Sequence, residues 1–240
     1  MRFFDISLMS STRWRQSHAM SHHTFPNTCL DLEVTQFEPF AYLMPKPTSL
    51  FYNIFSLFIL PILLTAVTFI DFLKRWISNL LFTEDEFELV DLIPFLELYG
   101  FYLVNKESYL WFFFVFHGTL SFTFAFLSLP GIHHHSSNFY EGHQGRKDTD
   151  WGLLQVDTIV DRWLTSSDNT SHSIAVSAFG DHTLHHLFPT VDGSILQHFI
   201  PAYRITLAEF NINYKQSNCF YDWFEFTKVL FTTKQKKKQK

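Results

Sequence analysis

The chain has 240 residues, of which 19% are aromatic and only 17% are charged. This charge content is below the roughly 25% usual for soluble domains, and 30 phenylalanines make the chain too apolar for a disordered protein. A net charge of −5 argues against nucleic acid as a partner, and two cysteines are too few for a disulfide scaffold. The unusual feature is the 13 histidines, most of which gather in clusters.

The N-terminal segment, residues 1–47, is polar with a few apolar side chains. It shows no basic stretch followed by an apolar core and a small-residue cleavage site, so we expect no secretory signal. It contains the first histidine cluster, which consists of His18, His22 and His23.

Residues 48–70 contain no Asp, Glu, Lys or Arg. As a helix rising about 1.5 Å per residue, this run would measure about 35 Å and could cross the roughly 30 Å hydrocarbon core of a bilayer. Lys46 precedes the run, and Asp71, Lys74 and Arg75 close it. The alternative is a buried core helix of a soluble protein, for which this run is long. We therefore predict a first membrane span over about residues 48–72.

The second charge-free run covers residues 108–132, with Tyr109 and Trp111 near its start as interface anchors. It predicts a second span within a transmembrane region of residues 48–132. Between the two runs lie an acidic patch and the short apolar piece 92–104, which we expect to be interfacial or to lead into the second span. His117 is either a satisfied polar residue of the helix bundle or a residue that lines a substrate channel.

Residues 133–233 contain no run of 18 apolar residues, so we expect a mostly helical polar domain with helices near 151–164 and 174–187. This region holds the remaining clusters. Residues 234–240 form a basic tail, for which attraction to anionic lipid is the simplest interpretation. The histidines of interest are His133, His134, His135, His143, His182, His185 and His186.

The spacing of the histidines favours a metal site. Positions i, i+3 and i+4 share one face of a helix, so His182, His185 and His186 point together, as do His18 and His22. Three adjacent rings at 133–135 cannot share a face, and at most two can point inward. Any single histidine could instead be a solvent-exposed or core residue. However, about ten imidazoles without neighbouring cysteines exceed one mononuclear site and suit two metal ions.

If the first and third clusters share that site, they lie on the same side of the membrane, and the number of crossings between them is even. The two predicted spans satisfy this condition. Lys and Arg are concentrated on the histidine side, which places that side and both termini in the cytosol. The fold class we predict is therefore all-α: an integral membrane helical protein with two transmembrane spans and a cytosolic helical domain that carries the histidines.

Two histidine motifs resemble those of the membrane fatty acid desaturases. His182-Thr-Leu-His185-His186-Leu-Phe-Pro189 is similar to the third histidine box of front-end desaturases, with His182 in place of Gln. Trp14 to His23, with Asn27 nearby, is similar to their second box, with a spacing one residue longer. A resemblance to the cytochrome b5-related proteins of insects covers nearly the whole chain, through residues 4–9, 17–23, 37–39, 133–135, 150–157, 161–162 and 179–189.

The resemblance implies a four-span, di-iron oxidoreductase of lipid metabolism in the endoplasmic reticulum membrane. Such an enzyme introduces a double bond into an acyl chain with O2 and electrons from cytochrome b5 and its reductase. Its substrate is a membrane lipid or acyl chain, and no catalytic residue is implied beyond the ligands of the two iron ions. The ligands that we expect are His18, His22, His23, His134, His135, His143, His182, His185 and His186.

The chain departs from the family pattern in two respects. The first box, HxxxH, and the haem-binding cytochrome b5 domain do not occur in these 240 residues. We therefore expect one iron to lack about two ligands and the chain alone to be incomplete as an enzyme, whether it is a fragment or a short isoform. Two alternatives stay open: an acyl hydroxylase on the same scaffold, and a catalytically inactive desaturase-like membrane protein.

Three carboxylates lie near the clusters in the sequence: Asp157, Asp161 and Asp181. Asp157, Asp161 and Arg162 have helical spacing and form either a surface ion pair or a group that orients a ligand histidine by a hydrogen bond. Asp181, next to His182, has the same two interpretations. Asn169-Thr-Ser171 is a glycosylation sequon that we expect to stay unused on the cytosolic side.

Overall fold

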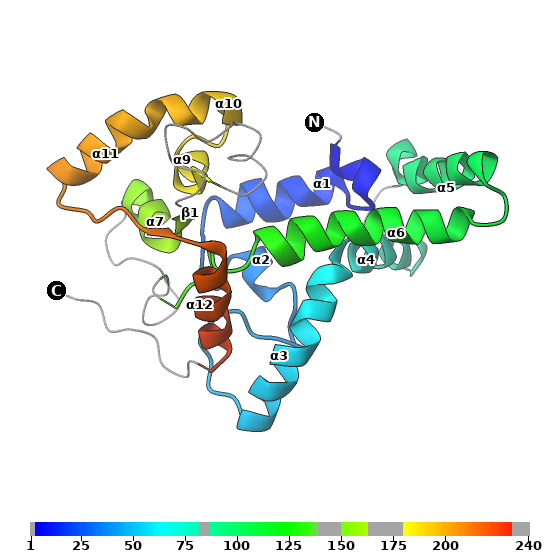
Figure 1. Ribbon diagram of the computed structural model, residues 1–240, viewed down its shortest axis with the longest axis horizontal. Coiled ribbons are helices and arrows are strands. Elements are labelled where there is room, and N and C mark those ends of the chain that lie inside the picture. The colour runs from blue at the N-terminus through cyan, green and yellow to red at the C-terminus, as the bar shows by residue number, and fades with distance from the viewer. Residues whose placement is uncertain (1–2, 82–86, 137, 139–149, 163–179, 232–240) are drawn as a thin grey trace.

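The computed structural model describes residues 3–81, 87–136, 138, 150–162 and 180–231 (Figure 1). This part of the chain is mainly helical, so the all-α prediction is confirmed. Its two short strands, β1 (Asp161–Arg162) and β2 (Gln216–Ser217), pair in parallel with Asp161 opposite Gln216. His143, the sequon at Asn169 and the basic tail lie outside the described residues.

The N-terminal elements, residues 3–35, carry the first histidine cluster, and we refer to them together as the base. Ser10 caps the first helix by accepting a hydrogen bond from the Arg13 amide, and Asp31 caps α2 by accepting one from the Glu33 amide. The α1 helix runs directly into η2, whose turns are π-helical. The elements are η1 (Phe3–Ser7), α1 (Ser11–Trp14), η2 (Arg15–His22) and α2 (Leu32–Thr35).

The first apolar run folds into two helices, α3 (Leu50–Thr65) and α4 (Val67–Leu81), which are bent by 76° at Ala66. Pro61 lies inside α3 and cannot donate a backbone hydrogen bond. The Thr65 hydroxyl donates to the Pro61 carbonyl at 2.8 Å, a type of bond that bends helices. The run is therefore helical, as predicted, but it is not one straight rod.

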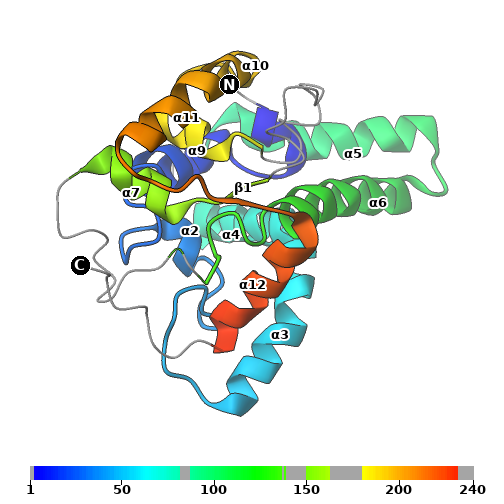
Figure 2. The same cartoon turned by 60° about the vertical axis from the view of Figure 1, so that its left-hand side comes forward.

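The second apolar run forms one arm of a helical hairpin that protrudes from one side of the molecule (Figures 1 and 2). Aromatic rings join its two arms, with Phe101 and Phe116 centroids 5.8 Å apart. His117 is buried between the arms, and its Nε2 lies 3.2 Å from Glu97 Oε2, so this histidine is paired inside the hairpin. The elements are η3 (Leu89–Leu92), α5 (Ile93–Val104), α6 (Tyr109–Ser121) and η4 (Phe122–Ser128).

Two elements of the described chain meet the length and composition of a membrane span. The first is the continuous helix over Tyr109–Phe126, and the second is the α3–α4 pair if it is counted as one broken span. The structure thus supports one or two spans, where the sequence predicted two.

The C-terminal half packs over the base and completes two apolar cores. One core joins α2, α3, η4 and α12 through Val34, Leu60, Ala125 and Phe226. The other joins α7, α9 and α11. The elements are α7 (Trp151–Thr158), α9 (His182–Leu187), α10 (Gly193–Leu196), η5 (Gln197–Phe199), α11 (Ile200–Glu209) and α12 (Cys219–Phe231).

Candidate metal centre

Seven histidine rings from three parts of the chain converge on one region between the base and the C-terminal half. They come from η2, from the segment that follows η4, and from α9. His133 Nε2 lies 3.1 Å from His22 Nε2 and 2.8 Å from His182 Nε2. The seven rings are those of His18, His22, His23, His133, His182, His185 and His186.

The rings form two adjacent groups of three, and in each group the ligand atoms lie within 4.8 Å of one another. One group is buried and consists of His22, His133 and His186. The other is partly exposed and consists of His18, His23 and His185. The rings of His23 and His186 stack with centroids 4.0 Å apart and so join the two groups. Each of the two groups has the ligand spacing that could hold a metal ion.

The π-helical turn of η2 brings His18 and His23 together. A π turn bonds residue i to residue i+5, and the His23 amide donates to the His18 carbonyl at 2.9 Å. As a result, the Nε2 atoms of the two rings lie 3.1 Å apart. The α-helical spacing assumed from the sequence pairs His18 with His22, and these two rings also lie together, with centroids 5.3 Å apart.

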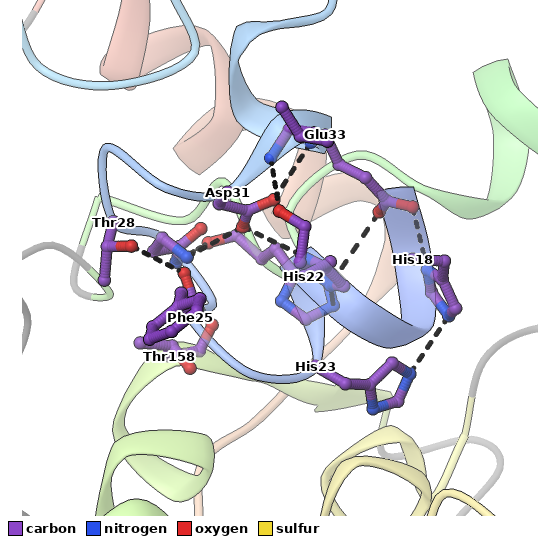
Figure 3. A network of polar contacts seen from close by, with 12 residues as sticks. His18, His22, His23, Phe25, Thr28, Asp31, Glu33 and Thr158 are labelled. Carbon is purple, nitrogen blue, oxygen red and sulfur yellow. Dashed lines mark hydrogen bonds and ion pairs between the residues drawn. The ribbon is translucent and has the colours of Figure 1, made fainter. Parts of the chain in front are cut away.

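Two carboxylates from the start of α2 orient the rings of the first cluster (Figure 3). The Asp31 Oδ2 atom lies 2.8 Å from His22 Nδ1, and Glu33 Oε1 lies 2.8 Å from His18 Nδ1. A proton held at Nδ1 by a carboxylate leaves the Nε2 lone pair free for a metal ion. The sequence offered no signal for either acid, because their nearness to the rings depends on the turn at 24–30.

Gln155 on α7 orients a ring of the third cluster and also forms a hydrogen bond to the backbone of the first. Its Oε1 lies 2.9 Å from His186 Nδ1, and its Nε2 donates to the His23 carbonyl at 3.2 Å. One turn earlier, Trp151 Nε1 donates to the same carbonyl at 3.2 Å. Residues i and i+4 of α7 therefore clamp two histidine clusters that lie far apart in the sequence.

Most of these rings are neutral at neutral pH. Burial, assisted by the neighbouring histidines, lowers the pKa of His23 to about 2 and that of His185 to about 4. The pKa values of His133, His182 and His186 are also lowered, for the same reason. Neutral imidazole is the form that binds metal ions.

His22 is the exception to this rule. Burial opposes its charged form, but Glu33 and Asp31 outweigh that effect and raise its pKa to about 9. Burial likewise opposes the charged form of Glu33, yet His22 and His18 lower the pKa of this carboxyl to about 2. This corner of the centre therefore holds a charged pair in the metal-free chain.

The residues present fit bound metal ions. His186 Nε2 and His23 Nδ1 are buried without a hydrogen-bond partner among the described residues. The Nε2 atoms that converge at His133 carry lone pairs that repel one another unless a proton or a cation lies between them. A set of imidazoles with nearby carboxylates is a donor set that iron accepts, as do zinc and copper.

Comparison with known proteins identifies the family. Residues 2–218 match the fatty acid desaturase family over most of the chain. The chain belongs to this family. It is also 34% identical over 225 residues to the cytochrome b5-related protein of Drosophila melanogaster, an alignment that covers 91% of this chain and 51% of that protein. The chain thus spans about half the length of this curated relative, and no solved structure matches it.

Within this desaturase-family centre, His133 occupies the place that we expected for His134 or His135. The ring of His134 lies 6.0 Å from that of Phe226, and the ring of His135 lies 5.9 Å from that of Tyr221. The turn at Gly131, just before these histidines, sets which of their rings points into the centre. Gly131 has φ +83° and lies so close to Asp222 that a Cβ atom there would be 2.3 Å from the Asp222 Cβ.

Of the three predicted carboxylates, Asp161 supports the desaturase-family centre. The helix predicted over 151–164 ends at Thr158, and Asp161 and Arg162 lie on β1, so they do not share a helix face with Asp157. Asp161 Oδ1 accepts hydrogen bonds from the amide and the hydroxyl of Thr183, at 2.8 and 3.0 Å, and so holds the first turn of α9. Asp181 precedes α9 in a left-handed conformation, and burial with nearby Asp161 raises its pKa to about 7. The Asp157 carbonyl accepts a hydrogen bond from the Lys215 amine.

A cavity of about 430 Å³ adjoins the histidines of this desaturase-family chain. Trp14, whose ring stacks on His18 at 4.4 Å, and Glu33 form its wall nearest to the centre. Apolar side chains, among them Phe37, Phe124 and Leu129, form much of the remaining wall. Charged side chains, among them Arg13, Asp71 and Lys74, line another part of the cavity, so its wall is partly apolar and partly polar.

Proposed function

We propose that this chain is the iron-binding part of a fatty acid desaturase that introduces a double bond into an acyl chain. It uses O2 and electrons from cytochrome b5, supplied by the reductase of that protein, in the endoplasmic reticulum membrane. The observation that carries the proposal is the pair of adjacent three-histidine groups in a chain of this family. The name of the Drosophila melanogaster relative, cytochrome b5-related protein, supports cytochrome b5 as the electron donor.

The histidines divide into two ligand sets. His22, His133 and His186, with His182 beside them, would hold one iron, and His18, His23 and His185 would hold the other. Bound iron supplies the activation of O2 and the oxidising power for removing two hydrogens from an acyl chain. Asp31, Glu33 and Gln155 keep the Nδ1 protons in place, so that each Nε2 points toward the centre.

The cavity next to Trp14 and Glu33 gives the acyl chain its position. The apolar part of its wall favours a hydrocarbon chain over water, which also keeps the reacting carbons away from solvent. Holding one carbon pair against the centre is the contribution to the rate that a protein makes when a cofactor supplies the chemistry.

Two measurements test the proposal: the iron bound per chain and the acyl product that forms. We expect the chain purified in detergent to bind about two iron ions, and His186→Ala to lower that content far more than His198→Ala, because His198 is exposed on η5. Equal losses in the two variants would contradict a localised centre.

The product separates the desaturase from its alternatives. We expect new double bonds in the membrane acyl chains when the chain is extended upstream by a helix pair with the HxxxH motif and is produced together with cytochrome b5 in yeast that lacks its own desaturase. The chain without that first box should give none. A hydroxylated acyl chain would indicate the hydroxylase on the same scaffold. Iron binding without any new product would indicate a desaturase-like protein without catalysis.

A further inference from the structure

Asp71 of α4 and Glu88, just before η3, lie beside the segment that leads into the first histidine cluster. Thr12, six residues before His18, donates its hydroxyl hydrogen bond to Glu88 Oε1 at 3.0 Å. At the middle of α4, the Asp71 carboxylate interacts with the Ser10 backbone and with Arg13. A helix pair that crossed a bilayer between residues 48 and 81 would carry Glu88 to the opposite surface, where it could not reach Thr12.

Buried polar contacts hold η3 beside α4. The Arg75 guanidinium of α4 pairs with the Asp91 carboxylate of η3, and both side chains are buried. Asn79 donates to Asp91 at 3.2 Å, and Asp91 also accepts from the Glu88 amide at 3.0 Å. Breaking a buried ion pair of this kind is strongly unfavourable, so the contact between α4 and η3 is a stable part of the fold.

The two faces of α4 differ in the way that suits a membrane surface. Asp71, Lys74 and Ser78, spaced as one face of a helix, line the cavity, and the neighbouring Arg75 is buried. Leu73, Ile77 and Leu80 are exposed on the other side of the helix. A helix with one polar and one exposed apolar face lies in the plane of the membrane interface rather than across the bilayer.

The α3 helix continues this apolar surface. Its exposed side chains recur every three to four residues and so form one stripe: Phe51, Ile54, Phe55, Phe58 and Ile62. Its opposite face contains the buried Asn53, Ser56 and Leu60, which pack on the body. Solvent-exposed apolar stripes of this length are rare in soluble proteins and mark a contact with a membrane or a partner.

The α5–α6 hairpin differs from α3 and α4, because it exposes apolar side chains all along its length. Leu96, Val104, Trp111 and Phe114 are among them. Its tip, residues 105–108, is polar, and Lys106 Nζ lies 5.9 Å from the centre of the Tyr102 ring. Lys next to Tyr is the pairing expected where a helix emerges from lipid into headgroups.

We propose that this chain contacts the bilayer through an L-shaped surface: α3 and α4 lie along the surface on the histidine side, and only the α5–α6 hairpin crosses. The occupant of the exposed stripe on α3 and α4 is lipid at the interface. This path differs from the crossing that the sequence predicted for residues 48–72, although the histidines still lie on one side. The inference rests on the proposed function only in taking a membrane as the location.

The hairpin spans the bilayer with local thinning. The α5 helix, at about 1.5 Å per residue, is about 18 Å long, and the hydrocarbon core is roughly 30 Å thick. A short span is accommodated by thinning of the bilayer and by flanking residues that reach the headgroups, as Lys106 can.

Cysteine labelling in sealed microsomes from cells that produce the full chain tests this path. The native Cys29, which is exposed and lies just after the first histidine cluster, reports the histidine side in a Cys219→Ser background. Leu89→Cys, at a position that is 81% exposed, reports the segment after α4, and Lys106→Cys reports the tip. Both are made in a Cys29→Ser, Cys219→Ser background and treated with a membrane-impermeant maleimide.

We expect Leu89→Cys to react in sealed microsomes as fully as Cys29 does, and Lys106→Cys to react only after detergent opens the membrane. Protection of Leu89→Cys would show that α3–α4 crosses, and reaction of Lys106→Cys in sealed microsomes would show that the hairpin does not; either result overturns the inference and leaves the desaturase proposal standing. Recovery of the chain in the soluble fraction would overturn both. Equal iron content in the variants and the parent shows that each has folded.

Discussion

At the scale of single residues, the rings are oriented by partners of unequal charge. His18 and His22 each have a carboxylate at Nδ1, whereas His186 has the neutral amide of Gln155. A carboxylate makes an imidazole a stronger electron donor than an amide does. Each iron of the proposed centre would therefore have one stronger ligand, His22 in the buried group and His18 in the partly exposed group.

Replacing Gln155 by Leu removes the acceptor for His186 Nδ1 and the donor to the His23 carbonyl. Losing such a partner typically lowers metal affinity about 10–100-fold and leaves a buried group unsatisfied at a cost of about 1–3 kcal/mol. Titration of the metal-free chain with ferrous iron measures the affinity. Gln155→Glu, which keeps the acceptor, should lose less, and Gln16→Leu on the exposed side of η2 should lose nothing. Unchanged binding by Gln155→Leu would contradict the role given to it.

Within the three adjacent histidines, His133 is the one that belongs to a group of three histidines with converging ligand atoms. His133→Ala should lower the bound iron to about half, because the buried group loses one of three ligands, whereas His135→Ala should leave it unchanged. Iron per chain, measured by elemental analysis, distinguishes the two. A larger loss from His135→Ala than from His133→Ala would show that the ring assignment is wrong.

The sequence predicted six of the seven rings but not His133. Spacing alone identified the two motifs, since His182, His185 and His186 share a helix face in any α-helix. For residues 133–135 it showed only that three rings cannot converge. The choice among them depends on the φ of Gly131 and its contact with Asp222, which lies 91 residues away in the chain and has no local signal.

At the scale of elements, the π turn of η2 explains the unusual spacing of the first motif. His18 and His23 are five residues apart, one more than the spacing that an α turn brings together. The π turn absorbs the extra residue, and Met20, between the two histidines, is exposed. π bulges of this kind are frequent at functional sites.

Deleting Met20 should convert the π turn into an α turn and keep the centre, because the former His23 then lies four residues after His18. Inserting an alanine after Met20 should abolish iron binding in the partly exposed group, because no regular helix places residues six apart on one face. Iron content of the two variants is the measurement. If both lose iron equally, the turn type is not what aligns the rings.

The sequence predicted that residues 48–70 are helical and apolar but could not predict their path. The hydropathy of a segment does not predict the hydrogen bond from the Thr65 hydroxyl to the Pro61 carbonyl or the bend at Ala66. The amphipathic pattern of α4 begins only at Asp71, just where the apolar run was taken to end. The bend and that pattern together give the run a different relation to the bilayer.

At the scale of the whole molecule, stability should depend on pH through the buried rings. The unfolded chain protonates its histidines near pH 6.5, but folded His185 does so only near pH 4 and His23 near pH 2. Below pH 6.5 the unfolded state therefore binds more protons, and stability falls as the pH falls. His22, with its raised pKa, acts in the opposite sense and loses its contribution only as the pH rises through about 9.

The thermal midpoint of the metal-free chain in detergent should accordingly decrease from pH 7 to pH 5. His185→Gln should show a smaller decrease, because it removes one of the rings that must stay neutral, and His198→Gln should follow the parent. A midpoint that rises on acidification would show that the histidines are not held in the neutral form.

The two three-histidine groups share one further property: each is completed by α9, through His186 in one and His185 in the other. The ribosome therefore makes α9 after every other ligand. At roughly 5–20 residues per second, α9 follows η2 by about ten seconds or more, by which time the hairpin has been synthesised. Before α9 is made, the nascent chain thus holds only two of the three histidines of each group, His18 with His23 and His22 with His133. Neither three-histidine group can be complete until synthesis has passed residue 186.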